Sequence, residues 1–305
     1  MVDLPRVATS ADVRQLRVHN GVAERQVRGG HWQRAARGVL LTSKDTPSSR
    51  DLVEVARAHV GAEFVVTGLL VLAELGLPWL PAVEAAHVLV PPEVRRRGGP
   101  LVRVTRTSGY DDLMTWRRHD AKLAAPDRAV IDAARGQSTL RDVRGIVLGA
   151  VGRRATTPVG LRAILDAGQR NGSALIRTAI SDAERGCASP PEAELVDGLI
   201  GRGVPFYVNP HLWLGDVWLG SPDVWLVGRN VGGEVESVEQ HGDDAQTEST
   251  YDRHERITAP GIELVHLSVR RIRADLDDAV AHLLSKPAVP TPTRLRVVPR
   301  GPLLQ

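Results

Sequence analysis

The sequence predicts an α/β protein, α+β overall, built from several small domains along one chain. First, short apolar runs bounded by Gly, Pro and Asn, which predict strands, are interspersed with longer stretches of helical periodicity. Second, a length of 305 residues suggests two or three domains. Third, residues 1–188 carry 28 Lys and Arg against 19 Asp and Glu, whereas residues 189–286 carry 8 against 17. The basic front section can attract a polyanion, and the acidic section cannot do so by itself.

Composition places the chain among ordinary globular proteins, with 42% apolar and 25% charged residues. Cys187 is the only cysteine, so no intrachain disulfide is possible, which fits a reducing cytoplasm. The first ten residues lack a basic start followed by an apolar run, and we expect no signal peptide. The most apolar stretch, Phe64–Val83, is broken by Glu, Gly and Pro, which predicts a buried helix and no membrane span.

Residues 1–47 are predicted to be a winged helix-turn-helix domain that binds double-stranded DNA. Two short helices, Ala11–His19 and Val22–Arg28, flank an Asn-Gly turn, and residues 31–41 read as a basic hairpin. In this order the second helix enters the major groove and the wing touches the backbone. Arg and Gln suit base edges and phosphates. The side chains predicted to contact DNA are Arg14, Arg17, Arg25, Gln26, Arg28, Arg34 and Arg37.

This stretch resembles the N-terminal winged-helix domain of the AbiEi antitoxin family, in which a short helix pair leads into G-x-W-x-R-x-x-x-G-V-Y. The matching residues here are Gly30, Trp32, Arg34, Gly38 and Val39, and Leu40 replaces the usual Tyr. The resemblance implies a DNA-binding antitoxin with a toxin as partner. The alternative is that Trp32 and Val39 are core residues and that the Arg side chains form a solvated face.

Residues 48–188 are predicted to be a mixed middle domain with a helical segment. The apolar stripes of its later helices suit a core or an interface, and a homodimer contact there stays open. A basic loop, Arg95–Arg97, either rests on phosphate or is solvated. The predicted helices are Ser49–Val60, Thr67–Leu75, Asp127–Arg135, Leu140–Val151, Pro158–Ala167 and Ser173–Arg185. The predicted strands are Ala86–Val90, Leu101–Thr107 and Leu113–His119.

Residues 189–286 are predicted to form an α/β unit, followed by a Pro-rich tail, 287–305, that is extended or disordered. The predicted helices are Glu192–Ile200, Asp244–Arg256 and Val269–Leu284. The predicted strands are Phe206–Leu214, Val217–Gly220, Val224–Val227, Val231–Ser237 and Gly261–Ser268. The acidic charge of this unit suits metals or a basic protein partner.

Three acids are expected to converge in this unit. If the strands around residues 224–227 and 231–237 pair as a hairpin, Asp223 and Glu234 lie side by side, and Glu236 shares a strand face with Glu234. Three carboxylates repel one another unless a cation or a proton sits between them. Mg²⁺ is the natural guest of oxygen ligands, with Mn²⁺ as a substitute. The alternative is a solvated face whose acids discourage aggregation.

The same residues resemble the PD-(D/E)XK nuclease superfamily. Pro222-Asp223 matches its PD, Glu234 matches its second acid, and Glu236 stands where the family has Lys. Residues 189–195, 233–241 and 250–256 follow the order of actinobacterial proteins related to very-short-patch-repair endonucleases. The resemblance implies a restriction-endonuclease-like core.

The resemblance also implies roles for individual residues. Asp223 and Glu234 would hold Mg²⁺, and Glu192 would position the metal or its water. Glu236 would act as a base or a further ligand, and His241 would contact phosphate or a metal-bound water.

Other chemistries are excluded by missing motifs. One cysteine rules out a zinc-finger set, and the chain has no HExxH and no P-loop. Two functions remain. The first is a DNA-binding protein with a metal-dependent DNA endonuclease domain that hydrolyses phosphodiesters. The second is a transcriptional regulator or antitoxin whose nuclease fold is catalytically inactive.

Overall fold

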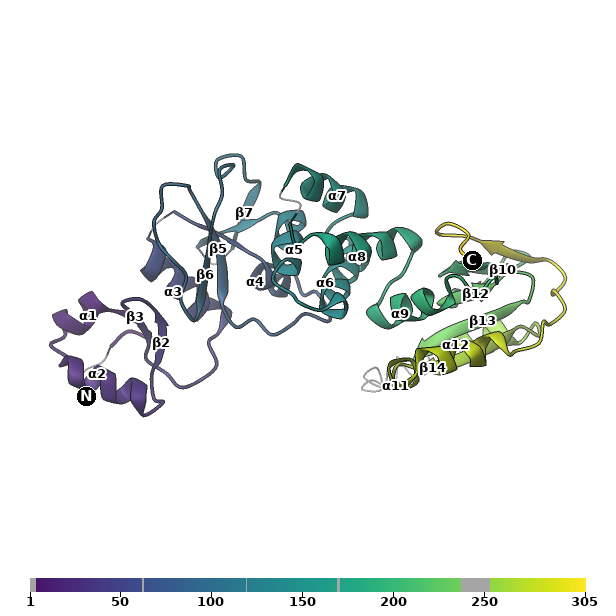
Figure 1. The fold of residues 1–305 in the computed structure, drawn as a ribbon, viewed down its shortest axis with the longest axis horizontal. Helices are drawn as coiled ribbons and strands as arrows, with labels where there is room; N and C mark the ends of the chain where they lie inside the picture. The colour runs from purple at the N-terminus through teal and green to yellow at the C-terminus, as the bar shows by residue number, and fades with distance from the viewer. Residues whose placement is uncertain (1–3, 62, 119, 169–170, 237–252) are drawn as a thin grey trace. The chain divides into compact units, whose positions relative to one another are not determined.

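The computed structural model describes residues 4–61, 63–118, 120–168, 171–236 and 253–305. The fold is mixed α/β, as predicted, with four small sheets among the described residues (Figure 1). The chain divides into two compact units, residues 1–146 with 153–176, and residues 147–152 with 177–305. None of the described helices has the length and apolar character needed to cross a membrane.

The N-terminal elements are β1 (Val7–Thr9), α1 (Ser10–Gln15), α2 (Asn20–Arg28), β2 (Gln33–Ala36) and β3 (Val39–Leu41). The strands form a sheet in the order β1-β3-β2, and β1 was not predicted. Thr9 and Asp12 form a capping box that starts α1. α1 ends earlier than expected, because Arg17 adopts a left-handed φ of 53°. The predicted helix pair and hairpin are confirmed.

These elements pack against the middle of the same unit. The Arg6 guanidinium donates to Asp51 Oδ1 at 2.7 Å, and the Leu101 amide donates to the Ala35 carbonyl at 2.9 Å. Gly99 lies against Ala36 so closely that a Cβ there would stand 2.7 Å from the Ala36 Cα. The N-terminal hairpin is therefore joined to the middle sheet at the loop that precedes β6.

The middle sheet has the order β6-β5-β4-β8-β7, with both parallel and antiparallel neighbours. Its strands are β4 (Val65–Thr67), β5 (Ala86–Val90), β6 (Val102–Arg106), β7 (Thr115–Arg118) and β8 (Ala121–Ala124), with α3 (Ser49–Val60) and α4 (Leu69–Glu74) beside them. The helix predicted over residues 67–75 was wrong at its start. Thr67 ends a strand, and Gly68, with a φ of 71°, turns the chain into α4. β8 was missed, because Asp120 makes a left-handed turn inside a short polar stretch.

The helices that follow confirm the predicted ones within a residue or two. Pro126 stands at the first position of α5, and the Thr157 hydroxyl accepts the Gly160 amide at the start of α7. Their bounds are α5 (Pro126–Ala134), α6 (Leu140–Gly152), α7 (Pro158–Ala167) and α8 (Ala174–Arg185).

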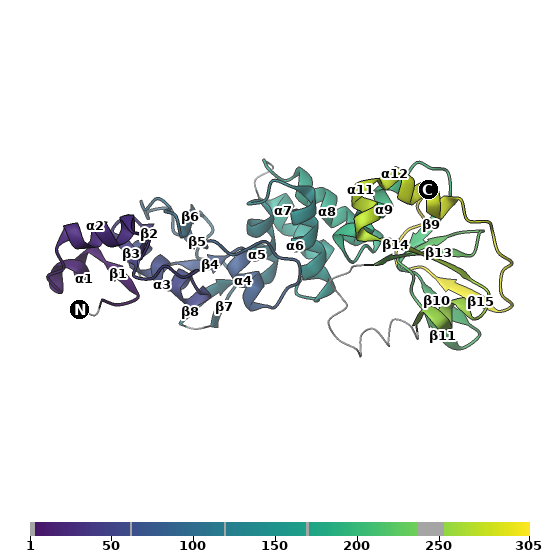
Figure 2. The same cartoon turned by 90° about the horizontal axis from the view of Figure 1, so that it is seen from below.

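The second unit has three layers (Figure 2). The sheet β14-β13-β12-β9 lies between a helical layer and a second sheet, β11-β10-β15. The helices are α9 (Pro190–Leu199), α11 (Val269–Ala274) and α12 (Leu276–Leu284). The strands are β9 (Phe206–Val208), β10 (His211–Leu214), β11 (Val217–Gly220), β12 (Val224–Leu226), β13 (Val231–Glu236), β14 (Glu263–Ser268) and β15 (Leu295–Val298).

Three predictions in this unit needed correction. The single strand over residues 206–214 is two strands, because Asn209 adopts a left-handed φ of 47° and turns the chain. The last helix breaks at Asp275, whose side chain caps α12 by accepting the Asp278 amide at 2.9 Å. The tail is partly ordered, since β15 pairs with β10 and Leu304 exchanges two backbone hydrogen bonds with Phe206. Of the helix predicted over residues 244–256, only 253–256 lie within the described residues, in a helix over 253–258.

Candidate functional site

The predicted acids gather at one end of the sheet β14-β13-β12-β9. β12 and β13 pair antiparallel with Val224 opposite Gly233, so Asp223 and Glu234 follow as neighbours along this hairpin. The Val235 amide donates to Asp223 Oδ2 at 2.6 Å. The predicted hairpin is confirmed, and it holds the Asp223 carboxylate against the backbone of β13.

The surroundings of Asp223 strongly raise the pKa of its carboxyl group. Burial of the carboxyl group raises its pKa well above the ordinary value, and the nearby Glu192 carboxylate raises the pKa further. The Val235 amide and the Arg253 guanidinium act in the opposite direction. Asp223 as a whole is half-buried, and it is the carboxyl end of its side chain that is withdrawn from water.

Glu192 is held by three internal donors. Its Oε1 accepts from the Ser189 hydroxyl at 2.8 Å, and its Oε2 accepts from the Ala188 amide and from Asn209 Nδ2, each at 2.9 Å. The first two bonds fix the start of α9, where the hydroxyl of the N-cap residue Ser189 also accepts the Glu192 amide. The third ties α9 to the turn between β9 and β10. Asn209 was missed by sequence reasoning, although Asn-Pro is a turn signal.

Glu234 is buried and forms an ion pair with Arg253 from the helix over residues 253–258. The pair joins Arg253 Nη2 to Glu234 Oε1, and the other oxygen, Oε2, is buried without a hydrogen-bond partner in the described part of the chain. Arg253 was not predicted as a site residue. Its sequence signals were its place in a charged run predicted to be helical and in the stretch 250–256 that carries the nuclease resemblance.

Glu236 lies on the same face of β13 and contacts His266, which in turn contacts His254. Its Oε1 is 2.6 Å from His266 Nδ1, and His266 Nε2 is 2.7 Å from His254 Nδ1. The angle between Glu236 Oε1 and His266 Nδ1 is not that of a hydrogen bond. The contact is therefore an ion pair only when His266 is protonated. Both acids of Glu234-Val235-Glu236 therefore meet basic side chains of this unit. His241 lies outside the described residues.

Among the residues that the structure describes, these acids do not form a ligand set for Mg²⁺ or Mn²⁺, and the metal stays a prediction. Within the described residues, no group of three or more His, Cys, Asp or Glu is placed to hold a metal ion. Mg²⁺ requires near-octahedral oxygen ligands about 2.1 Å away. Glu192 accepts hydrogen bonds at the start of α9, and Asp223 accepts one from the Val235 amide. One oxygen of Glu234 pairs with Arg253. A guanidinium thus supplies the positive charge that these acids require.

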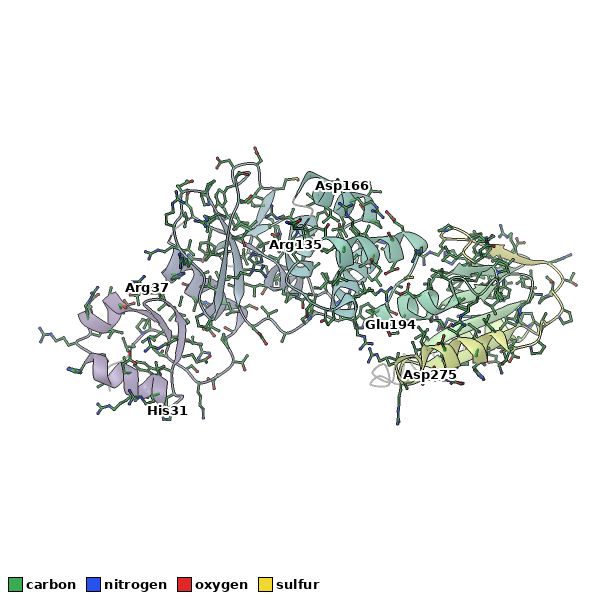
Figure 3. All side chains as sticks on the ribbon, in the orientation of Figure 1. His31, Arg37, Arg135, Asp166, Glu194 and Asp275 are labelled. Carbon is green, nitrogen blue, oxygen red and sulfur yellow. The ribbon has the colours of Figure 1, made fainter. Side chains whose placement is uncertain are left out.

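The predicted DNA-binding side chains lie on the first five elements and on the turns between them. Arg25 and Arg28 are one helical turn apart in α2, and Arg37 occupies the turn between β2 and β3 (Figure 3). Arg34 differs from the others, because its Nη2 pairs with both oxygens of Glu24 at 2.6 and 2.7 Å. The exposed ones are Arg14, Arg17, Arg25, Arg28, Arg34 and Arg37, and Gln26 is half-buried.

A hollow of about 370 Å³ lies among these elements. It is lined by residues from α1, α2 and the hairpin, including Arg14 and Arg34. Two of the predicted basic side chains, with Glu24 beside them, therefore border a concave surface.

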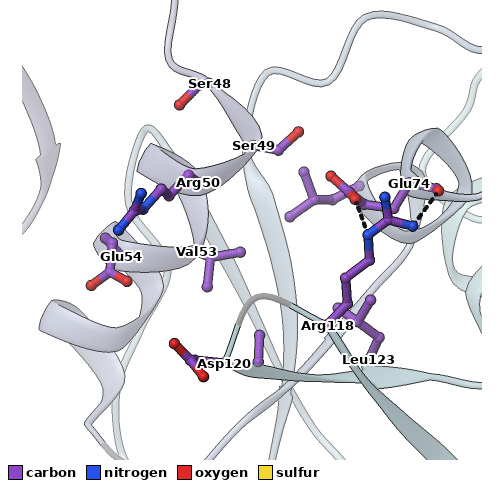
Figure 4. A pocket seen from close by; sticks show the side chains of 11 residues that line it. Ser48, Ser49, Arg50, Val53, Glu54, Glu74, Arg118, Asp120 and Leu123 are labelled. Atoms are coloured by element: carbon purple, nitrogen blue, oxygen red, sulfur yellow. Dashed lines mark hydrogen bonds and ion pairs between the residues drawn. The ribbon is translucent and has the colours of Figure 1, made fainter.

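A larger hollow, about 590 Å³, lies in the middle of the first unit (Figure 4). The start of α3 lines it with Ser48 and Arg50, and Glu74, Arg118 and Asp120 face it from other elements. The Arg118 Nε donates to Glu74 Oε2 at 2.9 Å. Its charges are mixed and partly compensated, and the hollow suggests no single class of ligand.

A buried polar network crosses the middle sheet. The Thr67 hydroxyl and Arg128 Nε both donate to Asp132 Oδ2, at 2.9 and 2.8 Å. His87, opposite Thr67 on β5, has its Nε2 2.9 Å from the Thr105 hydroxyl. Burial lowers the pKa of His87 to about 4, and the attraction of Asp132 only partly offsets it. His87 is therefore neutral near pH 7.

Comparisons with known proteins leave the family open. The chain matches no protein family and no curated protein. Among solved structures, it is similar to the crystal structure of the RV2827C protein from Mycobacterium tuberculosis, with a TM-score of 0.38 and 15% identity over 62% of this chain and 75% of that one. So distant a likeness carries no functional argument.

Proposed function

We propose that this protein is a DNA-binding transcriptional regulator or antitoxin, whose C-terminal unit has an endonuclease-like fold that does not hydrolyse DNA. The observation that carries the proposal is the ion pair between Arg253 and Glu234. Arg253 compensates the charge of Glu234, which a nuclease of this type would use to bind its metal ion. Double-stranded DNA is the proposed ligand, and a basic toxin is the proposed protein partner.

The N-terminal elements support the DNA-binding role. Two helices, a hairpin and the added strand β1 follow the order of a winged helix-turn-helix domain. The Arg14, Arg17, Arg25, Arg28 and Arg37 side chains are exposed and have no ion-pair partner within the described residues. Free exposed guanidinium groups are available for phosphates, and α2 would present Arg25 and Arg28 to the groove.

The C-terminal unit supports an inherited fold without retained chemistry. A helix, a mixed sheet with a parallel pair and two closing helices follow the order expected of a restriction-endonuclease-like core. Glu192, Asp223 and Glu234 converge, but each has an internal partner. With Glu236 in place of Lys, the position has no donor to stabilise charge on an attacked phosphate.

Binding to DNA tests the first part of the proposal. We would measure fluorescence anisotropy with a duplex taken from upstream of the protein's own gene and with a scrambled duplex, over a range of salt. The variant carrying Arg25→Ala and Arg28→Ala should bind about 10-fold or more weakly, and its slope of log affinity against log salt should fall by about 2. Arg270→Ala, an exposed change on α11, is the matched control. Equal affinity of the wild type for both duplexes would contradict a regulator.

A metal-dependent endonuclease is the second candidate, because one buried oxygen, Glu234 Oε2, lacks a partner close to Asp223. Plasmid cleavage with Mg²⁺ or Mn²⁺, beside EDTA and Asp223→Ala controls, separates the two. We expect intact plasmid from a protein that still binds DNA. Metal-dependent nicking that disappears in Asp223→Ala would make the protein an enzyme.

A further inference from the structure

The second unit carries a small sheet with one aromatic face. Along β10, Leu212 and Leu214 pack against an apolar core that also contains Trp225, whereas Trp213 between them does not. Successive side chains of a strand point to opposite faces, so Trp213 lies on the outer face. The neighbouring strands repeat the pattern. The core side holds Leu219 of β11 and Leu295 and Val297 of β15. The outer side holds Trp218 of β11 and Arg296 of β15.

The three outer side chains stand in one row across the sheet. Trp213 is paired directly with Trp218 of β11 on one side and with Arg296 of β15 on the other. Directly opposed residues have Cβ atoms about 5 Å apart and share a face. Trp218 is 44% exposed, so a large part of its aromatic surface faces solvent.

Guanidinium groups flank both indole rings. The Arg296 Cζ lies 5.6 Å from the centre of the Trp213 ring, and the Arg256 Cζ lies 6.0 Å from the centre of the Trp218 ring. Both arginines are exposed, and neither forms an ion pair within the described residues. The acids nearest in sequence to this row are Asp216 in the β10–β11 turn and Glu255 beside Arg256. The row therefore presents two aromatic surfaces with two uncompensated cations, although the unit as a whole is acidic.

We propose that this face binds single-stranded nucleic acid. Two bases would stack on Trp213 and Trp218 in place of the guanidinium groups that now lie over the rings, and Arg256 and Arg296 would swing onto the phosphates between them. Two indoles side by side suit successive unpaired bases, which stack on aromatic side chains without sequence preference. A protein partner would more naturally cover a broad apolar patch, and the outer face offers only a narrow row with cations at both ends. The site is separate from the duplex-binding surface proposed for the N-terminal elements, and it does not rest on that proposal.

The test is fluorescence anisotropy of the full chain with a fluorescein-labelled 15-nucleotide oligo(dT) at low salt. The variant with Trp213→Ala and Trp218→Ala should bind at least 10-fold more weakly. Trp218→Phe, which keeps an aromatic ring, should stay within about 3-fold of the wild type. The variant with Arg25→Ala and Arg28→Ala should lose duplex affinity and keep oligo(dT) affinity, which separates this site from the N-terminal one.

A second pair of substitutions tests the same face through its arginines. If the double tryptophan variant does not fold, Arg256→Ala with Arg296→Ala should weaken oligo(dT) binding and lower its salt slope by about 1.4. The proposal is overturned if the wild type does not bind oligo(dT), or if these variants bind it as the wild type does. It is also overturned if the wild type is a dimer that the tryptophan changes dissociate, because the face would then join two copies of the chain.

Discussion

At the scale of single residues, the pairing of Glu234 with Arg253 decides how the acidic end of the sheet is stabilised. Glu234 is only 5% exposed, and a buried carboxylate is costly unless a cation or hydrogen bonds compensate it. Arg253 supplies that compensation from a different element, and it also lowers the pKa of Asp223. One guanidinium therefore compensates Glu234 directly and Asp223 through its charge.

We predict that Arg253→Ala lowers the free energy of unfolding by about 2 to 3 kcal/mol, because Glu234 is then buried without its partner. Urea denaturation at pH 7 measures the loss, and the Arg270→Ala control should change it by no more than about 0.5 kcal/mol. Adding Glu234→Gln to Arg253→Ala should restore part of the stability, since no charge is then left unpaired. A loss in Arg253→Ala as small as that of the control would contradict the pairing.

His87 gives a prediction for the dependence of stability on pH. Its pKa is about 4 in the folded protein, and about 6.5 is the ordinary value of an unfolded chain. As pH falls from 6.5 toward 4, the unfolded state takes up a proton that the folded state refuses, so stability is lost in that window.

In His87→Gln, the loss of stability between pH 7 and pH 4 should be smaller than in the wild type by about 3 kcal/mol. Urea midpoints at several pH values measure it, and exposed His31→Gln should leave the wild-type dependence unchanged. Parallel curves for His87→Gln and the wild type would show that His87 is not held neutral.

At the scale of elements, local signals predicted what local chemistry decides. α7 was predicted with its observed bounds, because Thr157 and Pro158 mark its start and an apolar stripe fixes its length. β5 was also predicted with its observed bounds. The tail strand β15 was not predicted, since its Pro-rich sequence has no strand pattern of its own and the strand forms only against β10. The break at Asp275 was missed for a different reason, because its signal is local: the side chain caps α12 in competition with the helix backbone.

The candidate site shows the same division. The convergence of Asp223 and Glu234 was predictable, because a short hairpin fixes their register. The contact between Ser189 and Glu192 was also predictable, because the two residues stand three positions apart at the start of α9. Arg253 could not be assigned, because its contact with Glu234 depends on how a distant helix packs over β13. Sequence spacing carries no information about that packing.

The attachment of the tail gives a prediction about one glycine. A Cβ on Gly301 would lie 2.4 Å from the carbonyl oxygen of Arg185, so Gly301→Ala must displace the backbone. We expect a loss of about 1 to 3 kcal/mol and faster proteolysis after β15. Gly152→Ala, whose Cβ would meet nothing within 4 Å, is the control and should not destabilise. Unchanged proteolysis in Gly301→Ala would show that the tail is not fixed there.

At the scale of the whole molecule, the chain holds more than one core. The first unit buries apolar residues of the middle sheet, such as Leu70 and Leu89, and the second buries Phe206 and Leu283 among others. Each unit is compact by itself. Proteins of this kind commonly unfold in more than one step.

We predict two unfolding transitions in differential scanning calorimetry. Leu70→Ala, which removes a fully buried side chain, should lower the melting temperature of one transition, and Gly301→Ala should lower that of the other. A single transition that both changes shift equally would show that the units unfold as one.

The pairing of β15 with β10 also has a consequence for synthesis. The two strands are adjacent in the sheet, but about 80 residues of chain separate them, and a ribosome adds roughly 5 to 20 residues per second. β10 therefore waits several seconds or more in the nascent chain with one edge unpaired. During that time β10 offers an open strand edge beside Trp213, which is the kind of surface that chaperones shield.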